Sequence, residues 1–271
     1  MALFDDVFNR SAIYDTLFFN VKGVLQYPTL KELEENNKEL YERWKYLSKT
    51  KYGCDVDSGH YVASTMKDET PEYAQKTYEE NAVYYPEFSR IVVISYAKLY
   101  IEDGKIKRTL KKIANDNEEI VIATFMDELK QISSDGSRST PQVFPTLCGY
   151  NIISYDIPML IKRFIVNREK IEDKQLPYIL KRAMNIKPWE SGLMDVVNIW
   201  KFNGYDIMPL MLIADFVGLK RTTDVLPLPE FSKYYWENIK TSPDKTWEFI
   251  GLQSVTHTNL VIQLLNELRQ L

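Results

Sequence analysis

Residues 147–164 read LCGYNIISYDIPMLIKRF, and no other part of the sequence says as much about the architecture. Its apolar beginning predicts a short buried strand over residues 146–150 that ends near Gly149. Residues 156–168 are predicted to form a helix with Pro158 in the first turn, where proline is tolerated. A strand followed closely by a helix indicates an α/β sheet.

Further strands are predicted on the N-terminal side of this stretch. Residues 14–22, YDTLFFNVK, have the aromatic and β-branched content of a buried strand. Asp103 and Gly104 form a hairpin signal between two other strand-like segments. The predicted strands in this part of the chain are residues 14–22, 90–102, 105–113 and, as an extension of the sheet, 120–124.

Helices are predicted for most of the remainder. Residues 29–50 carry leucines and Trp44 at near-helical spacing among many charged residues, which predicts an amphipathic helix. The other predicted helices are residues 71–83, 125–132, 174–184, 193–202, 207–217 and 247–269. Early strands with late helices indicate an α/β fold in one domain, residues 1–271, with a helical insertion at residues 28–85.

The composition excludes several classes of protein. The chain has 271 residues, 45% of them hydrophobic, and a net charge of −4, which is typical of a folded protein. No apolar run approaches the roughly 18 residues that cross a bilayer. The first ten residues carry acids where a signal peptide carries bases. Two cysteines without a CxxC pair argue against a zinc ribbon. We expect a soluble cytoplasmic protein that does not bind membranes.

Two outer segments accompany the stretch at residues 147–164. Residues 17–24 read LFFNVKGV and residues 254–265 read SVTHTNLVIQLL, with PEFSRIVVIS, FMDELK and LMDVVNIWKFNG between them. In this order and spacing the sequence resembles the DnaQ-like, or DEDD, 3′–5′ exonucleases, in the predicted branch related to the proofreading domain of family B DNA polymerases. The resemblance implies an RNase H-like fold with a mixed central sheet flanked by helices.

The same resemblance implies four carboxylates that hold two Mg²⁺ or Mn²⁺ ions, because phosphodiester hydrolysis by two metals requires hard oxygen ligands. Carried onto this sequence, the first two acids fall on Asn20 and Lys22. The third falls on Asp156 and the fourth on Asn259. Asp156 is therefore the one surviving carboxylate of the family pattern.

Lysine at position 22 fits a metal site less well than the two asparagines do, because an ammonium group repels a divalent cation. Val255 occupies the position of the family's water-orienting tyrosine, and His257 faces another side of the helix from Asn259. We therefore expect a catalytically inactive exonuclease-like protein that needs no metal cofactor. It would serve as a structural or protein-interaction subunit of a larger assembly, such as a phage particle or a phage replication complex.

Two other functions stay open. An inactive relative would still bind single-stranded DNA or a 3′ end if it kept a positive groove with stacking aromatic rings. The candidate residues for that groove are Lys22, Tyr150, Asn151, Tyr155, Lys162 and Arg163. An active metal-dependent 3′–5′ exonuclease would have to recruit other acids, for which Asp15 and Asp195 are the candidates.

Most of these candidates also have a structural interpretation. Asp156 and Asp195 precede helical segments and suit an N-cap role, and Asn151 would stabilise the loop before its helix. A cluster of basic residues on the predicted hairpin would either contact phosphates or form a solvated edge that discourages strand pairing. The cluster consists of Lys105, Lys107, Arg108, Lys111 and Lys112.

Overall fold

The computed structural model describes residues 16–55, 60–61, 71–103, 105–134, 145–185, 192–202 and 204–269. The chain divides into two compact units. The first consists of Met1–Lys22, Ile91–Val225 and Trp247–Leu271, and the second of Gly23–Arg90 and Leu226–Thr246. The expected helical insertion, residues 28–85, lies within the second unit.

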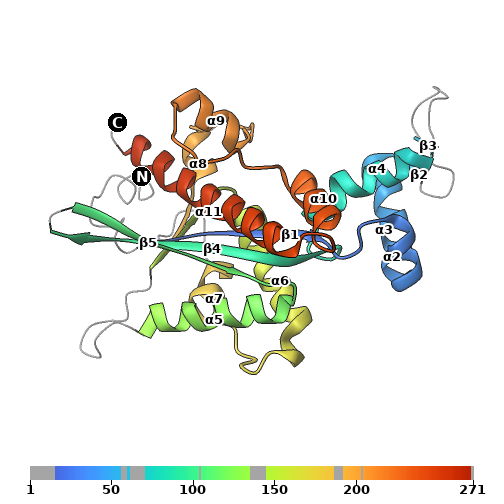
Figure 1. Ribbon diagram of the computed structural model, residues 1–271, viewed down its shortest axis with the longest axis horizontal. Helices are drawn as coiled ribbons and strands as arrows, with labels where there is room; N and C mark the ends of the chain where they lie inside the picture. The colour runs from blue at the N-terminus through green and yellow to red at the C-terminus, as the bar shows by residue number, and fades with distance from the viewer. Residues whose placement is uncertain are drawn as a thin grey trace. The chain divides into compact units, whose positions relative to one another are not determined.

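A mixed five-stranded sheet forms the centre of the first unit (Figure 1). Its strands are β1 (Thr16–Leu25), β4 (Ser89–Glu102), β5 (Lys105–Ala114), β6 (Thr146–Gly149) and β7 (Leu193–Asp195), in the order β5-β4-β1-β6-β7. β4 and β5 form an antiparallel hairpin, whereas β1, β6 and β7 run parallel. β1 is the middle strand, and all ten of its residues are buried.

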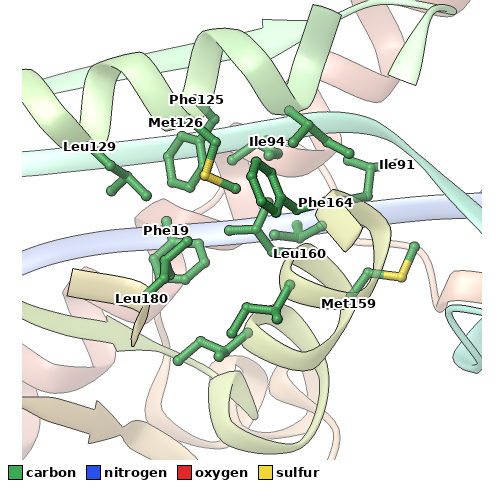
Figure 2. Packing of buried hydrophobic residues seen from close by; sticks show 14 of the residues in the cluster. Phe19, Ile91, Ile94, Phe125, Met126, Leu129, Met159, Leu160, Phe164 and Leu180 are labelled. Atoms are coloured by element: carbon green, nitrogen blue, oxygen red, sulfur yellow. The ribbon is translucent and has the colours of Figure 1, made fainter. Parts of the chain in front are cut away.

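Helices cover both faces of this sheet (Figure 1). One face carries α8 (Val196–Trp200), α9 (Leu210–Val217) and α11 (Pro243–Leu268), and the other carries α5 (Glu118–Ser134), α6 (Ile157–Asn167) and α7 (Tyr178–Asn185). Successive side chains of a strand point to opposite faces. Accordingly Phe18 packs in the first layer, and Leu17 and Phe19 pack in the second, where Phe19 lies among Phe125, Leu160 and their neighbours (Figure 2).

The second unit is mostly helical. Its elements are α2 (Leu30–Asn36), α3 (Lys38–Tyr52), α4 (Pro71–Asn81), the short 3₁₀ turn η1 (Ala82–Tyr84), α10 (Leu228–Asn238) and two two-residue strands, β2 (Cys54–Asp55) and β3 (His60–Tyr61). Trp44 is fully buried here, and the rings of Tyr78 and Phe88 meet its ring edge-on at 5.4 and 5.2 Å. This aromatic centre gives the second unit a core of its own.

The α/β class and the mixed sheet flanked by helices are confirmed. The strands predicted at residues 90–102, 105–113 and 146–150 are confirmed, as is the first strand from Thr16 onward. The strand predicted at residues 120–124 is wrong, because these residues lie inside α5. Their β-branched run suggested a strand, but two acids in the first turn and one buried helical face favour the helix.

The helix predictions need several corrections. The helix at residues 29–50 is two helices, because the side chain of Asn37 accepts a hydrogen bond from the Leu40 N–H at 3.0 Å and starts a new one. The segment at residues 193–202 begins as β7 before it turns into α8. α7 starts later than predicted, and α10 was not predicted. The other predicted helices are confirmed to within a few residues, apart from the additional N-terminal turns of α5.

The described helices include none that is long and apolar enough to span a membrane.

Phe125 offers a test of this core. It is fully buried on α5, and its ring lies 5.6 Å from the rings of both Phe19 and Tyr96. Phe125→Ala should lower the free energy of unfolding by about 3–5 kcal/mol, because it leaves a cavity. Ile120→Ala, at a half-exposed position of the same helix, should cost less than about 1 kcal/mol. Urea unfolding measures both; equal losses would contradict this packing.

Candidate functional site

The backbone of residues 147–164 restricts which residues fit at Gly149 and Asn151. A Cβ atom at Gly149 would come within 3.0 Å of the Phe19 carbonyl oxygen and of the Ile152 side chain, so the strand end admits only glycine without rearrangement. Asn151 adopts a left-handed conformation with φ of 62°, which asparagine tolerates better than most residues. A π-helical turn, η2 (Ile152–Asp156), then leads into α6. The expected role of Asn151 in stabilising this loop fits its conformation.

Asp156 binds the central strand. Its Oδ1 atom accepts hydrogen bonds from the Val21 N–H at 2.5 Å and from the Asn20 side-chain amide at 3.2 Å. Asp156 is only 2% exposed, and its side chain makes no capping hydrogen bond to α6. The N-cap interpretation is therefore wrong, because the carboxyl group points to β1 instead of its own helix.

Lys22 lies in the same buried cluster. It is 3% exposed and shares one face of β1 with Asn20, as the alternation of the strand requires. Burial lowers the pKa of Lys22 to about 8, and attraction to Asp156 opposes that shift. Burial likewise raises the pKa of Asp156 to about 8, against the hydrogen bond from Val21 and the attraction of Lys22. The structure thus brings together two charged groups that the sequence placed 134 positions apart.

A second buried carboxylate lies close enough to raise the pKa of Asp156. This is Asp195, whose side chain accepts hydrogen bonds from the N–H groups of Asn151 at 2.8 Å, Val197 at 3.1 Å and Ile153 at 3.2 Å. Asp195 therefore caps α8 and anchors the loop before α6, as its capping interpretation predicted. Burial raises its pKa, and the three N–H groups oppose that shift.

Hydroxyl groups complete the cluster on the α11 side. Ser254 and Thr258 lie one turn apart on α11, and Ser95 on β4 binds both, at 2.8 and 2.6 Å. The Ser254 hydroxyl also lies 3.5 Å from the Asn20 side-chain oxygen. Sequence reasoning missed these three residues. Their signal was a pair of small polar residues at i and i+4 within an apolar helical stripe.

The two remaining candidates on α11 face different surroundings. Burial and the nearby charge of Lys22 hold the pKa of His257 well below its ordinary value, and its ring meets that of Tyr150 edge-on. Its Nε2 atom is buried without a hydrogen-bond partner among the described residues. The Oδ1 atom of Asn259 is in the same condition. The charge of Lys22 reaches His257, so this residue adjoins the cluster.

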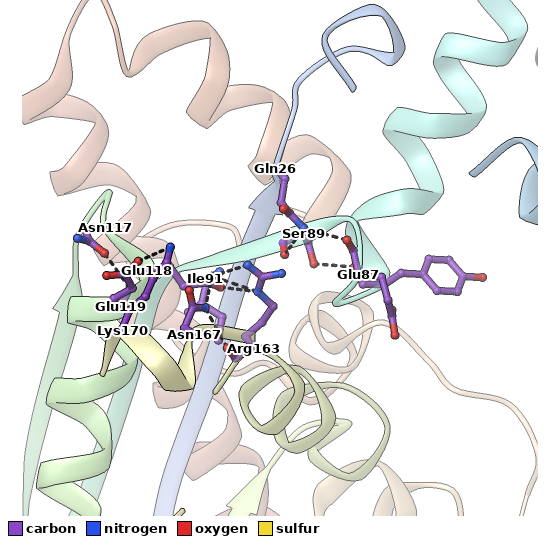
Figure 3. A network of polar contacts seen from close by, with 11 residues as sticks. Gln26, Glu87, Ser89, Ile91, Asn117, Glu118, Glu119, Arg163, Asn167 and Lys170 are labelled. Carbon is purple, nitrogen blue, oxygen red and sulfur yellow. Dashed lines mark hydrogen bonds and ion pairs between the residues drawn. The ribbon is translucent and has the colours of Figure 1, made fainter. Parts of the chain in front are cut away.

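The residues expected to line a single-strand groove have other positions. Tyr150 is buried, and its hydroxyl group donates to the Met208 carbonyl. Lys162 is exposed on α6, whereas the neighbouring Arg163 is buried and binds both carboxylate oxygens of Glu118, at 2.6–3.1 Å (Figure 3). The expectation that Arg163 faces a groove does not fit this geometry, because its guanidinium group lies inside the core.

Glu118 organises that part of the core. Besides Arg163, its carboxylate accepts hydrogen bonds from the Ile91 N–H at 2.6 Å and from the Asn167 side chain at 2.8 Å (Figure 3). The network therefore connects α5, α6 and β4. Arg163 and Asn167 of α6 therefore serve the interior of the fold.

The basic hairpin is the edge of the sheet, since β5 is an outer strand. Lys107 is paired with Glu102, and Lys111 with Glu128 at 3.2 Å. These partners agree with the solvated-edge interpretation. Asp15 lies outside the described residues, and so do the side chains of Lys105 and Cys54. Cys148 is a buried free thiol.

The residues present do not fit a two-metal centre. The carboxylates of Asp156 and Asp195 already accept backbone N–H groups, and an ammonium group shares their cluster. Within the described part of the chain, no three His, Cys, Asp or Glu side chains form a group that could hold a metal ion. The arrangement instead places the buried amino group of Lys22 near the carboxyl group of Asp156, which in turn lies near that of Asp195.

Comparisons with protein-family models, curated proteins and solved structures give no match for this chain.

The buried carboxyl group of Asp156 predicts a pH dependence of stability. Its pKa of about 8 lies above the ordinary value of 3.8, so the folded chain keeps this proton where the unfolded chain has lost it. As pH rises from about 4 to about 8, the wild type should lose stability relative to Asp156→Asn, by up to about 1 kcal/mol per pH unit. The asparagine keeps an acceptor for Val21. Urea unfolding at a series of pH values measures the difference; a constant difference would contradict the burial of the carboxyl group.

The Arg163–Glu118 pair predicts a large effect from a residue expected at the surface. Arg163→Met should lower the free energy of unfolding by about 3–5 kcal/mol, because it leaves a buried carboxylate without its cation. Lys162→Met, at the exposed neighbouring position, should change it by about 0.5 kcal/mol or less. Adding Glu118→Gln to Arg163→Met should recover part of the loss. Comparable effects of the two single substitutions would contradict the assignment.

Proposed function

We propose that this chain is an exonuclease-like domain with an RNase H-like fold that no longer hydrolyses phosphodiesters and serves as a structural or protein-interaction subunit of a larger assembly. The observation that carries the proposal is the buried ammonium group of Lys22 beside Asp156. Lys22 holds the position at which the family resemblance expects a metal-binding glutamate.

The architecture supports the resemblance. Strand β1, the first strand among the described residues, is the middle strand of a mixed sheet with helices on both faces. The residues that resemble the first and middle exonuclease motifs, Asn20, Lys22 and Asp156, meet in one buried cluster. A converted catalytic centre requires this proximity, so the cluster is consistent with the proposal.

The electrostatics of Lys22 oppose a metal ion. Two unit charges about 4 Å apart interact by roughly 4 kcal/mol at an effective dielectric constant near 20. Against a divalent cation the repulsion is about twice as large, which corresponds to about six decades in affinity. Lys22 instead supplies a positive charge of its own to Asp156.

The two alternatives have less support. Single-strand binding at this site would use Lys22, Tyr150 and Arg163, and all three are buried. An exonuclease with substitute ligands would use Asp195, whose carboxylate accepts three backbone N–H groups. Among the described groove candidates, Lys162 is exposed, and Asn151 and Tyr155 are half-buried.

The test is degradation of 3′-labelled single-stranded DNA with Mg²⁺ and with Mn²⁺, by the wild type and by Asp156→Asn. We expect no release of nucleotides from either protein beyond that from a buffer control. If the wild type degrades the DNA and Asp156→Asn does not, the proposal is overturned, and the chain is an active exonuclease that depends on Asp156.

Restoring acids should restore metal binding if the cluster is a converted metal centre. Asn20→Asp combined with Lys22→Glu would set two more carboxylates beside Asp156. The unfolding temperature of this double variant should rise by several degrees from EDTA to Mn²⁺, because a ligand of the folded state stabilises it. The wild type should show no such rise. A folded double variant that does not respond to Mn²⁺ would contradict the proposed origin of the site.

A further inference from the structure

An exposed apolar surface lies on the first unit. It belongs to α8, α9 and the segment between them, and we call it the α8–α9 face (Figure 1). Its exposed residues are Phe202, Tyr205, Ile207, Met208, Leu212 and Phe216. Tyr205 is 97% exposed and Phe216 is 80% exposed.

The α8–α9 face is continuous. The ring of Trp200, at the end of α8, lies 6.3 Å from the rings of both Phe202 and Phe216 and so joins the two helices. Leu212 and Phe216 are four residues apart on α9 and therefore share one side of that helix. Phe202, Leu212 and Phe216 therefore belong to one surface, and Tyr205, Ile207 and Met208 are exposed in the segment between the two helices.

The size of this face matches one side of a stable interface. An aromatic side chain offers ~150–250 Å² of contact area; scaled by their exposed fractions, the three aromatic residues of this face and its three aliphatic ones present roughly 700 Å² in all. A standard interface buries about 800 Å² per partner, whereas the largest apolar patch of a typical monomer is about 300–600 Å². Phe, Tyr and Met are also enriched where proteins meet.

The charge of this face restricts its partner. Residues 196–217 contain one lysine, Lys201, and two aspartates, Asp206 and Asp215. Asp215 is paired with Arg221 at 2.6 Å. Nucleic acids and anionic lipid surfaces are bound through clusters of basic residues, which this segment lacks. Two copies of such a weakly charged surface repel each other little.

We propose that a second copy of this chain binds the α8–α9 face and that the protein is a two-fold symmetric dimer. A two-fold interface places the same patch on both subunits, so the patch must be complementary to itself. A large, apolar and nearly uncharged surface meets that condition. The second copy is then one partner of the proposed subunit, and the biological role of the dimer rests on the function proposed above.

The experiment is light scattering after size exclusion, with sedimentation equilibrium on the full chain at about 1–100 µM. The wild type should show twice the chain mass of 31.8 kDa. Tyr205→Glu and Phe216→Glu should each weaken the dimer by about 30-fold or more, because they place a charge in the centre of the contact. Circular dichroism and the unfolding temperature of each variant as a monomer check that both still fold, since both side chains are exposed.

The matched control is Ile165→Glu, which introduces the same charge at an exposed apolar position of α6. It should leave the dimer intact. A wild type that stays monomeric at the highest concentration overturns the inference, and so does a dimer that Tyr205→Glu and Phe216→Glu leave unchanged. Neither of these outcomes touches the loss of hydrolysis, which the DNA degradation assay tests separately.

Discussion

The burial of β1 on both faces is the constraint on which the rest of the first unit depends. A strand buried along its whole length cannot give a polar side chain to water, so each such group must find a partner inside the protein. Asn20 donates its amide to Asp156, and Lys22 interacts with the same carboxyl group. Asp156 also accepts the backbone N–H of Val21, and it thereby ties the start of α6 to the central strand.

Charges placed so deep are costly, and the opposing pKa shifts of Lys22 and Asp156 express that cost. Below about pH 8 the Asp156 carboxyl group is mostly protonated, so the cluster then buries the Lys22 charge beside a largely neutral hydrogen-bonding partner. In the proposed history of this chain, a lysine in place of a metal ligand satisfied the remaining aspartate and preserved the packing of β1, α6 and α11. In the same proposal, hydrolysis was lost while the fold remained usable as a subunit.

The strong periodic signals predicted the sheet and most helices from the sequence, and the spacing of residues 147–164 correctly marked a strand, a tight loop and a helix. The misses have physical causes. The β-branched residues of α5 favour a strand locally, and the apolar face that α5 packs against Phe19 and Phe164 outweighs this preference. Lys162 and Arg163 are adjacent basic residues, and the local sequence does not show which of them is buried. Arg163 is buried because it pairs with Glu118, 45 residues earlier in the sequence. The hydroxyl cluster of Ser95, Ser254 and Thr258 depends on contacts between distant segments that no local pattern contains.

The protonation of Lys22 is the most direct measure of its burial beside Asp156. Selective ¹³C labelling of lysine allows NMR titration of the Lys22 side chain in the wild type and in Asp156→Asn. The account predicts a pKa of about 8 in the wild type, below the ordinary 10.5, and a lower value in Asp156→Asn because the attracting charge is gone. An ordinary pKa that is the same in both proteins would contradict the burial of Lys22. The ammonium group would then lie in water and would no longer keep a metal ion away from Asp156.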